Sequence, residues 1–205
     1  MTALDDLLEH PTVVRLRAAL AAHPGQRLEL EGSVVRRAAI ALVLRPGAAG
    51  EPELLMIKRA EAERDPWSGH VACPGGRMEP GDHDLEQTAI RETWEETGVD
   101  LARDGRVLGA LDDLSPRSPV LPPIVVRPFV AVVKPEVAVV QSSEVAEAFW
   151  VPVSALRERA AWGTGLVQVR DRGELEVAVF RHGPYTVWGL TERALRQFLE
   201  YLSGD

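Results

Sequence analysis

A glycine turn followed by a helix with three carboxylates on one face is the feature that most constrains this chain. Residues 75–99 begin with two glycines and continue into a predicted helix that carries Glu92, Glu95 and Glu96. Each helical residue advances by about 100°, so positions i, i+3 and i+4 share one face. Like charges at this spacing destabilise a helix unless a cation lies among them. The pattern therefore predicts a divalent metal site.

The alternative is a solvated helix face, which is the usual environment of a run of glutamates. Arg91 argues against it, because it lies four residues before Glu95, where a guanidinium group can hold a carboxylate in one orientation. Gly75 and Gly76 form a turn, and they also allow a backbone carbonyl to approach a ligand closely. Oxygen donors are preferred by Mg²⁺ and Mn²⁺, whereas zinc favours histidine and cysteine. The sequence therefore predicts Mg²⁺ or Mn²⁺.

This segment resembles the Nudix (MutT-like) box, G-x5-E-x7-R-E-U-x-E-E-x-G-U, where U is an aliphatic residue. The matching positions are Arg91, Glu92, Glu95, Glu96, Gly98 and Val99. Thr93 replaces the first aliphatic residue. Asp82 replaces the first glutamate and lies nine rather than eight residues before Arg91. The same one-residue extension is typical of the coenzyme A diphosphatase branch of the Nudix hydrolases.

Flanking segments extend the resemblance to that branch. Residues 54–59 and 69–76 resemble its LLxxxR and GxxxFPGG runs, and residues 187–195 resemble its IWGxTARIL segment. Cys73 departs from the usual phenylalanine, and the spacer 64–68 is longer than in the branch.

The resemblance implies an α+β fold, a Nudix-type α/β/α sandwich with a mixed β-sheet. By the family pattern, Glu92, Glu95, Glu96 and the carbonyl of Gly75 bind metal. Glu92 binds metal or accepts a proton, and Arg91 orients the carboxylates. Nudix enzymes commonly add a carboxylate from outside the box. Here Glu144 is the first choice and Glu147 the alternative, and either is otherwise an ordinary surface carboxylate.

The implied function is divalent-metal-dependent hydrolysis of the pyrophosphate bond of a nucleoside diphosphate linked to another moiety. Coenzyme A or a derivative is the first candidate substrate. An alternative within the family is a pyrophosphatase acting on nucleoside triphosphates, ADP-ribose or dinucleotides. A non-catalytic nucleotide-sensing module is the alternative of another class, but such modules usually lose box carboxylates that this chain keeps. A homodimer is implied by the resemblance alone.

Charge and composition exclude several other classes. The net charge of −8 disfavours binding to nucleic acid polymers, which requires clustered Lys and Arg. No stretch approaches the roughly 18 apolar residues that span a bilayer, and the acidic N-terminal segment is unlike a signal peptide. The single cysteine suits a reducing compartment, so we expect a small-molecule enzyme of the cytoplasm.

Hydrophobic periodicity predicts one domain over residues 26–205, preceded by an accessory helix within 1–25 that caps the core in preference to forming a dimer contact. The proline-rich run 115–123 is expected to be an extended loop. The predicted strands are 38–44, 53–59, 107–111, 124–133 and 147–153, with a hairpin over 165–179, and the predicted later helices are 154–160 and a segment from Thr191.

The sequence also suggests roles for four further residues. Asp82 is expected to cap the N-terminus of the box helix rather than to act in catalysis. His70 is expected to be structural rather than a phosphate contact. Trp67 could equally stack on a base or pack against the protein. Cys73 is expected to be a small core residue, because no histidine or cysteine motif accompanies it.

Overall fold

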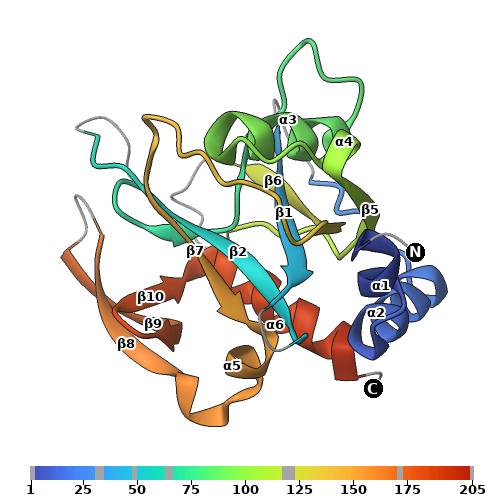
Figure 1. The fold of residues 1–205 in the computed structure, drawn as a ribbon. Coiled ribbons are helices and arrows are strands. Elements are labelled where there is room, and N and C mark those ends of the chain that lie inside the picture. Colours follow the sequence, from blue (N-terminus) through green and yellow to red (C-terminus); the bar gives the residue numbers. More distant parts are fainter. Residues whose placement is uncertain are drawn as a thin grey trace.

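The computed structural model describes residues 3–30, 35–47, 50–62, 67–116, 123–169 and 173–203. These residues form two β-sheets and flanking helices (Figure 1). The central strand is β1 (Arg36–Pro46), which pairs in parallel with β6 (Ile124–Val133). Strands β2 (Pro52–Arg59) and β4 (Gly75–Arg77) both pair antiparallel with β1. The larger sheet is therefore mixed.

The remaining strands complete both sheets. Strands β3, β5 and β7 join the larger one, in which β3-β2-β1-β6-β5 is the main order and β7 pairs with β2. Strands β8, β9 and β10 form a separate antiparallel sheet, in the order β10-β9-β8. The bounds are β3 (Val71–Ala72), β5 (Gly105–Ala110), β7 (Val145–Pro152), β8 (Trp162–Val169), β9 (Gly173–His182) and β10 (Tyr185–Trp188).

Helices cover both faces of the larger sheet. Figure 1 shows α3 and α4 above it and α1, α2 and α6 on the other side. The helices are α1 (Ala3–Leu8), α2 (Pro11–Ala22), α3 (Leu85–Thr97), α4 (Leu101–Asp104), α5 (Val153–Arg157) and α6 (Gly189–Ser203). No helix in the described part of the chain is long and apolar enough to cross a membrane.

The alternation of side chains along β1 explains the two helical layers. Ala39 and Ala41 belong to a core cluster that includes Ala89 of α3, and their small side chains let this helix approach the sheet. Leu42 and Leu44 belong to a second cluster, on the face covered by α2 and α6. The α/β/α sandwich with a mixed sheet is thus confirmed.

The N-terminal segment forms two helices rather than one. The helical stripe is interrupted before Pro11, which occupies the first turn of α2, where a missing N–H costs nothing. Its apolar residues Val13, Leu16 and Leu20 are buried in the core cluster shared with α6. Tyr201 of α6 donates a hydrogen bond of 3.0 Å to the carbonyl of His23.

The longer predicted strands and the hairpin are found within one to three residues of their expected bounds. The turn of the hairpin at residues 170–172, and residues 117–122 of the predicted proline-rich loop, lie outside the described part. The short elements β3, β4 and α4 were not predicted, because two to four residues are too few to show a periodic pattern.

Candidate metal centre

The ends of α3 are fixed by its flanking residues. Asp84 is the N-cap, and its side chain accepts a hydrogen bond of 2.8 Å from the backbone N–H of Gln87. Gly98 ends the helix with φ of 68°, a left-handed conformation that favours glycine. The three box glutamates consequently occupy the last turns of α3.

Asp82 does not cap the helix, and that prediction was wrong. Its buried carboxylate accepts hydrogen bonds from Arg91 Nε at 2.9 Å and Nη2 at 3.0 Å, from Thr88 Oγ1 at 2.9 Å and from the backbone N–H of Glu79 at 2.9 Å. The hydrogen bond from Arg91 holds the pKa of Asp82 well below its usual range. The capping position instead belongs to Asp84, which directly precedes the first helical residue.

Arg91 connects the helix to the glycine-rich strand. Besides its two bonds to Asp82, its Nη1 donates to Glu92 Oε1 at 3.1 Å and to Glu95 Oε2 at 2.9 Å. Its Nη2 also donates to the backbone carbonyl of Arg77 in β4 at 2.9 Å. A guanidinium group has five N–H donors, so all of them are engaged. Arg91 is therefore positioned to orient two of the box carboxylates.

Glu96 is the most buried of the three glutamates, with 4% of the residue exposed. Its Oε2 accepts a hydrogen bond of 2.8 Å from the backbone N–H of Gly75, and its Oε1 lies 3.5 Å from Arg59 Nη1. Burial raises the pKa of Glu96 to about 7, and the nearby charges of Glu92 and Glu144 contribute to the increase. A charged form is costly there without a cation.

Glu92 lies directly against the second glycine of the turn. A Cβ atom at Gly76 would lie 2.3 Å from Glu92 Oε1, so this contact has no room for a side chain. Burial raises the pKa of Glu92, an effect that Arg91 opposes and the charges of Glu95 and Glu144 reinforce. The glycine pair thus allows a strand and a carboxylate to meet closely.

Glu144 and Glu147 have different surroundings. Glu144 is exposed just before β7, and its charge raises the pKa of both Glu92 and Glu96. Glu147 instead accepts hydrogen bonds from Lys58 Nζ at 3.2 Å and from the Tyr185 hydroxyl at 2.6 Å. The structure therefore brings Glu144, and not Glu147, close to the box carboxylates.

The donor set fits a hard divalent cation. The charge of Glu144 raises the pKa of both Glu92 and Glu96, and a cation beside these carboxylates would reverse that repulsion. These side chains offer oxygen donors, which suit Mg²⁺ or Mn²⁺ better than zinc. Within the described ranges, no three acidic, histidine or cysteine side chains converge as a ready-made metal cage. Glu92 and Glu95 turn toward Arg91, whereas Glu96 turns toward Gly75.

A cavity of about 280 Å³ lies beside β2, β7 and β10, on the face of the sheet away from α3. Its lining includes Lys58, Glu147 and Tyr185. Lys58 immediately precedes Arg59 on β2, the arginine that faces Glu96. The sequence assigned no role to Arg59 or Tyr185. Arg59 ends the resembling run 54–59, which was the available signal, whereas Tyr185 had none.

The ring of His70 packs against two tryptophan rings. The ring of His70 lies 4.6 Å from that of Trp188 and 5.8 Å from that of Trp67, measured between centroids. Trp67 keeps 39% of its surface exposed. His70 thus has the packing expected of a structural residue, and Trp67 packs against a histidine while remaining accessible.

Cys73 is a buried core residue, as expected. Only 2% of the surface of Cys73 is exposed to solvent, and its Sγ lies 3.9 Å from Met56 Sδ. Burial raises the pKa of the thiol to about 12, so the nucleophilic thiolate is disfavoured.

A mixed sheet between helical layers, with a glycine turn and a carboxylate-bearing helix on one face, is the architecture of a Nudix pyrophosphohydrolase. The protein-family model of the NUDIX domain matches residues 34–169 of the sequence. The chain therefore belongs to the Nudix family. The resemblance of residues 75–99 to the Nudix box is thus confirmed.

Among its relatives are named coenzyme A diphosphatases. The chain is 33% identical over 168 residues to the mitochondrial coenzyme A diphosphatase NUDT8 of Homo sapiens, covering 79% of this chain and 70% of that protein. It is 36% identical over 141 residues to the peroxisomal coenzyme A diphosphatase ndx-8 of Caenorhabditis elegans, covering 67% of this chain. That alignment spans 56% of the nematode protein's own length.

Solved structures share the fold at lower identity. An Ap4A hydrolase of C. elegans in a binary complex has a TM-score of 0.55 at 21% identity, covering 83% of this chain and all of that one. A MutT/nudix family protein from Enterococcus faecalis also has a TM-score of 0.55, at 18% identity, covering 86% of this chain and 66% of that one. These likenesses confirm the fold alone.

Proposed function

We propose that this protein is a divalent-metal-dependent hydrolase that cleaves the diphosphate of coenzyme A or its derivatives. The chemistry is supported by one observation above all: Glu92 and Glu96 lie against the glycine turn, and the charge of Glu144 raises the pKa of both. The substrate class is supported by the identity to relatives named as coenzyme A diphosphatases. Cleavage of coenzyme A would give adenosine 3',5'-bisphosphate and 4'-phosphopantetheine.

The proposed metal ligands are Glu92, Glu95, Glu96 and the carbonyl of Gly75. A bound Mg²⁺ or Mn²⁺ ion would supply charge neutralisation at the diphosphate and activation of water. Glu92 binds metal or accepts a proton, and Glu144 is the additional carboxylate.

The other residues position these groups. Arg91 holds Glu92 and Glu95 while Asp82 holds Arg91, so the carboxylates are oriented before substrate arrives. Arg59 brings positive charge to Glu96, whose Oε1 lies 3.5 Å from Arg59 Nη1.

Three expectations remain predictions. The division into an accessory segment 1–25 and a domain 26–205 is one, and the homodimer is another. The cytoplasmic location is the third, because the named relatives are mitochondrial and peroxisomal proteins.

A substrate panel tests the proposal. Coenzyme A, ADP-ribose, reduced NAD, diadenosine polyphosphates and nucleoside triphosphates would each be incubated with the protein and Mg²⁺ or Mn²⁺, with products identified by mass. We expect the two coenzyme A products, and their absence with the Glu92→Gln variant. Turnover of another compound with coenzyme A untouched would overturn the substrate class. Tight binding without any turnover would support the sensing module instead.

A further inference from the structure

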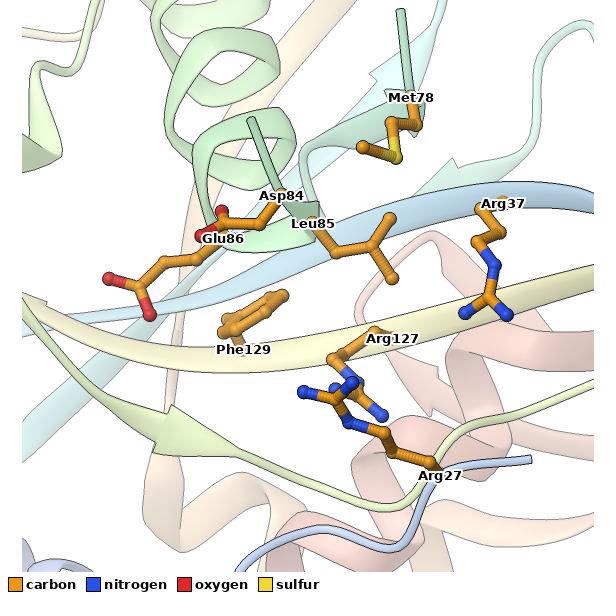
Figure 2. A pocket seen from close by; sticks show the side chains of 8 residues that line it. All are labelled: Arg27, Arg37, Met78, Asp84, Leu85, Glu86, Arg127 and Phe129. Carbon is orange, nitrogen blue, oxygen red and sulfur yellow. The ribbon is translucent and has the colours of Figure 1, made fainter. Parts of the chain in front are cut away.

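A second cavity, of about 290 Å³, lies at the opposite end of α3 from the carboxylates (Figure 2). Leu85, the first residue of α3, lines this cavity, whereas Glu96 lies eleven residues further along the helix. At about 1.5 Å per residue the two positions are roughly 16 Å apart. The cavity is therefore separate from the proposed metal centre. Its volume is near the lower end of the range for small-molecule sites.

Arg127 is a largely buried arginine whose terminal N–H donors face this cavity. Its side chain is 10% exposed, and its Nε donates to Asp113 Oδ1 at 2.7 Å. The terminal nitrogens donate to no other residue in the described part of the chain, and Figure 2 shows the guanidinium group at the cavity. These nitrogens are not among the buried atoms that lack a partner, so they are open to the cavity and available to an acceptor that enters it.

Arg27 is held at the same cavity by an anchored segment. The backbone N–H of Gln26 donates to Asp112 Oδ1 at 2.8 Å, and that of Leu28 donates to Asp113 Oδ2 at 3.0 Å. Asp113, whose side chain has no exposed surface, therefore secures both Arg127 and the backbone beside Arg27. Among the residues that the structure describes, Arg27 forms no hydrogen bond or ion pair of its own.

Arg37 completes a group of three arginines that line the cavity. Its ion pair with Glu29 is long, at 3.9 Å, and both side chains are well exposed, so the pair contributes little. The three positive charges lie on one side of the cavity and repel one another, whereas the carboxylates of Asp84 and Glu86 line the other side (Figure 2). A phosphate group would relieve this repulsion. One guanidinium group can donate two parallel N–H bonds to two phosphate oxygens.

The opposite side of the cavity has a different character. Phe129 and Leu85 provide an apolar wall, and Figure 2 shows the Glu86 carboxylate beyond it, away from the arginines. Glu86 would accept a hydrogen bond from an amino group and would repel a second anion. The cavity thus combines an anion-binding end, a flat apolar wall and a hydrogen-bond acceptor.

We propose that this cavity binds a nucleoside phosphate, with its phosphate at Arg27, Arg37 and Arg127 and its base against Phe129 and Leu85. The site is distinct from the metal centre and does not depend on which substrate that centre hydrolyses. Nucleoside phosphates that could bind here include the nucleotide product of a pyrophosphohydrolase and free adenine nucleotides.

Calorimetric titration of the metal-free protein with AMP tests the site, with adenosine and inorganic phosphate as comparisons. We expect AMP to bind at least ten times more tightly than either. The Arg27→Ala/Arg37→Ala double variant should weaken AMP binding at least tenfold. Arg127 is left in place, because its loss would leave Asp113 buried without its partner. Arg36→Ala, an exposed arginine one position away that does not line the cavity, should change the affinity less than twofold.

Three results would overturn the proposal: no AMP binding, an affinity unchanged in the double variant, or an equal loss with Arg36→Ala. Inorganic phosphate that binds as tightly as AMP would overturn the assignment to a nucleoside. Amide chemical shifts provide a second readout, and AMP should move the signals of Leu85 and Phe129. Because no metal is present and no hydrolysis is measured, failure here leaves the proposed pyrophosphohydrolase untouched.

Discussion

At the scale of single residues, the position of the carboxylates depends on the pair Asp82 and Arg91. The Asp82 side chain is only 3% exposed, so its charge relies on the guanidinium group. The same guanidinium holds Glu92 and Glu95. One ion pair thus serves both the stability of the fold and the geometry of the site.

Replacing Arg91 with lysine should therefore affect both properties. A lysine ammonium cannot reproduce the five directed N–H bonds, and Asp82 would be left partly unpaired. We expect a loss of about 2–4 kcal/mol in the free energy of unfolding, measured by urea denaturation, and a kcat lower by about 10- to 100-fold. The exposed Arg106→Lys on β5 is the matched control. Equal behaviour of the two variants would contradict the role of Arg91.

Glu96 is a residue where function and stability oppose each other. Its folded pKa of about 7 lies above the ordinary value of 4.5, so the folded protein binds more protons than the unfolded chain between these pH values. Its contribution to stability is therefore present at low pH and is lost as the pH rises through about 7. The pKa increase sets an upper limit of about 3 kcal/mol.

The Glu96→Gln variant should be inactive and yet more stable than the wild type without metal. In EDTA at pH 8 we expect its free energy of unfolding to exceed that of the wild type by about 1–3 kcal/mol, and the difference should shrink toward pH 5. Thermal unfolding across this pH range measures it. A variant that is less stable at pH 8 and equally dependent on pH would refute the explanation.

At the scale of elements, the site depends on the close approach of β4 to α3. Gly75 and Gly76 leave the glutamates in contact with the strand backbone, because neither carries a side chain. A helix with the right glutamates but a bulkier turn would hold them in a different place.

Gly76→Ala should therefore reduce activity without unfolding the protein. The new Cβ would meet the Glu92 carboxylate at 2.3–2.6 Å and displace it. We expect kcat to fall about 10- to 100-fold, since displacements near 1 Å at a reacting centre have effects of that size. Gly81→Ala is the matched control, because a Cβ there meets nothing within 4 Å. Unchanged kinetics for Gly76→Ala would show that this contact does not matter.

The elements also show what the sequence could predict. Strands β1 and β6 and helix α6 were predicted from their apolar patterns, β2 from a short apolar run after a turn, and α3 from the glycine turn and the spacing of its glutamates. The role of Asp82 was not predicted, because an aspartate at nearly the same position can serve either as a helix cap or in an ion pair. Only the fold shows that Asp84 precedes the helix while Asp82 faces Arg91.

At the scale of the whole molecule, the site joins segments that are far apart in the sequence. The box supplies Glu92 and Glu96, whereas Arg59 comes from β2 and Glu144 from the segment before β7. Pairing of β2 with β7, which places Arg59 opposite Val145, brings the last two together. Local patterns identify the box, but the partners from other strands depend on sheet pairing, which a single sequence does not reveal.

The measurement that tests the central claim most directly is Mn²⁺ binding, followed by electron paramagnetic resonance of the free ion. We expect the wild type to bind Mn²⁺ and the Glu92→Gln/Glu96→Gln variant to bind it on the order of 100-fold more weakly or worse. Glu147→Gln, whose carboxylate faces Lys58 and Tyr185, should remain within about threefold of the wild type. Equal affinity of the double variant and the wild type would contradict the assignment of a metal centre to these carboxylates.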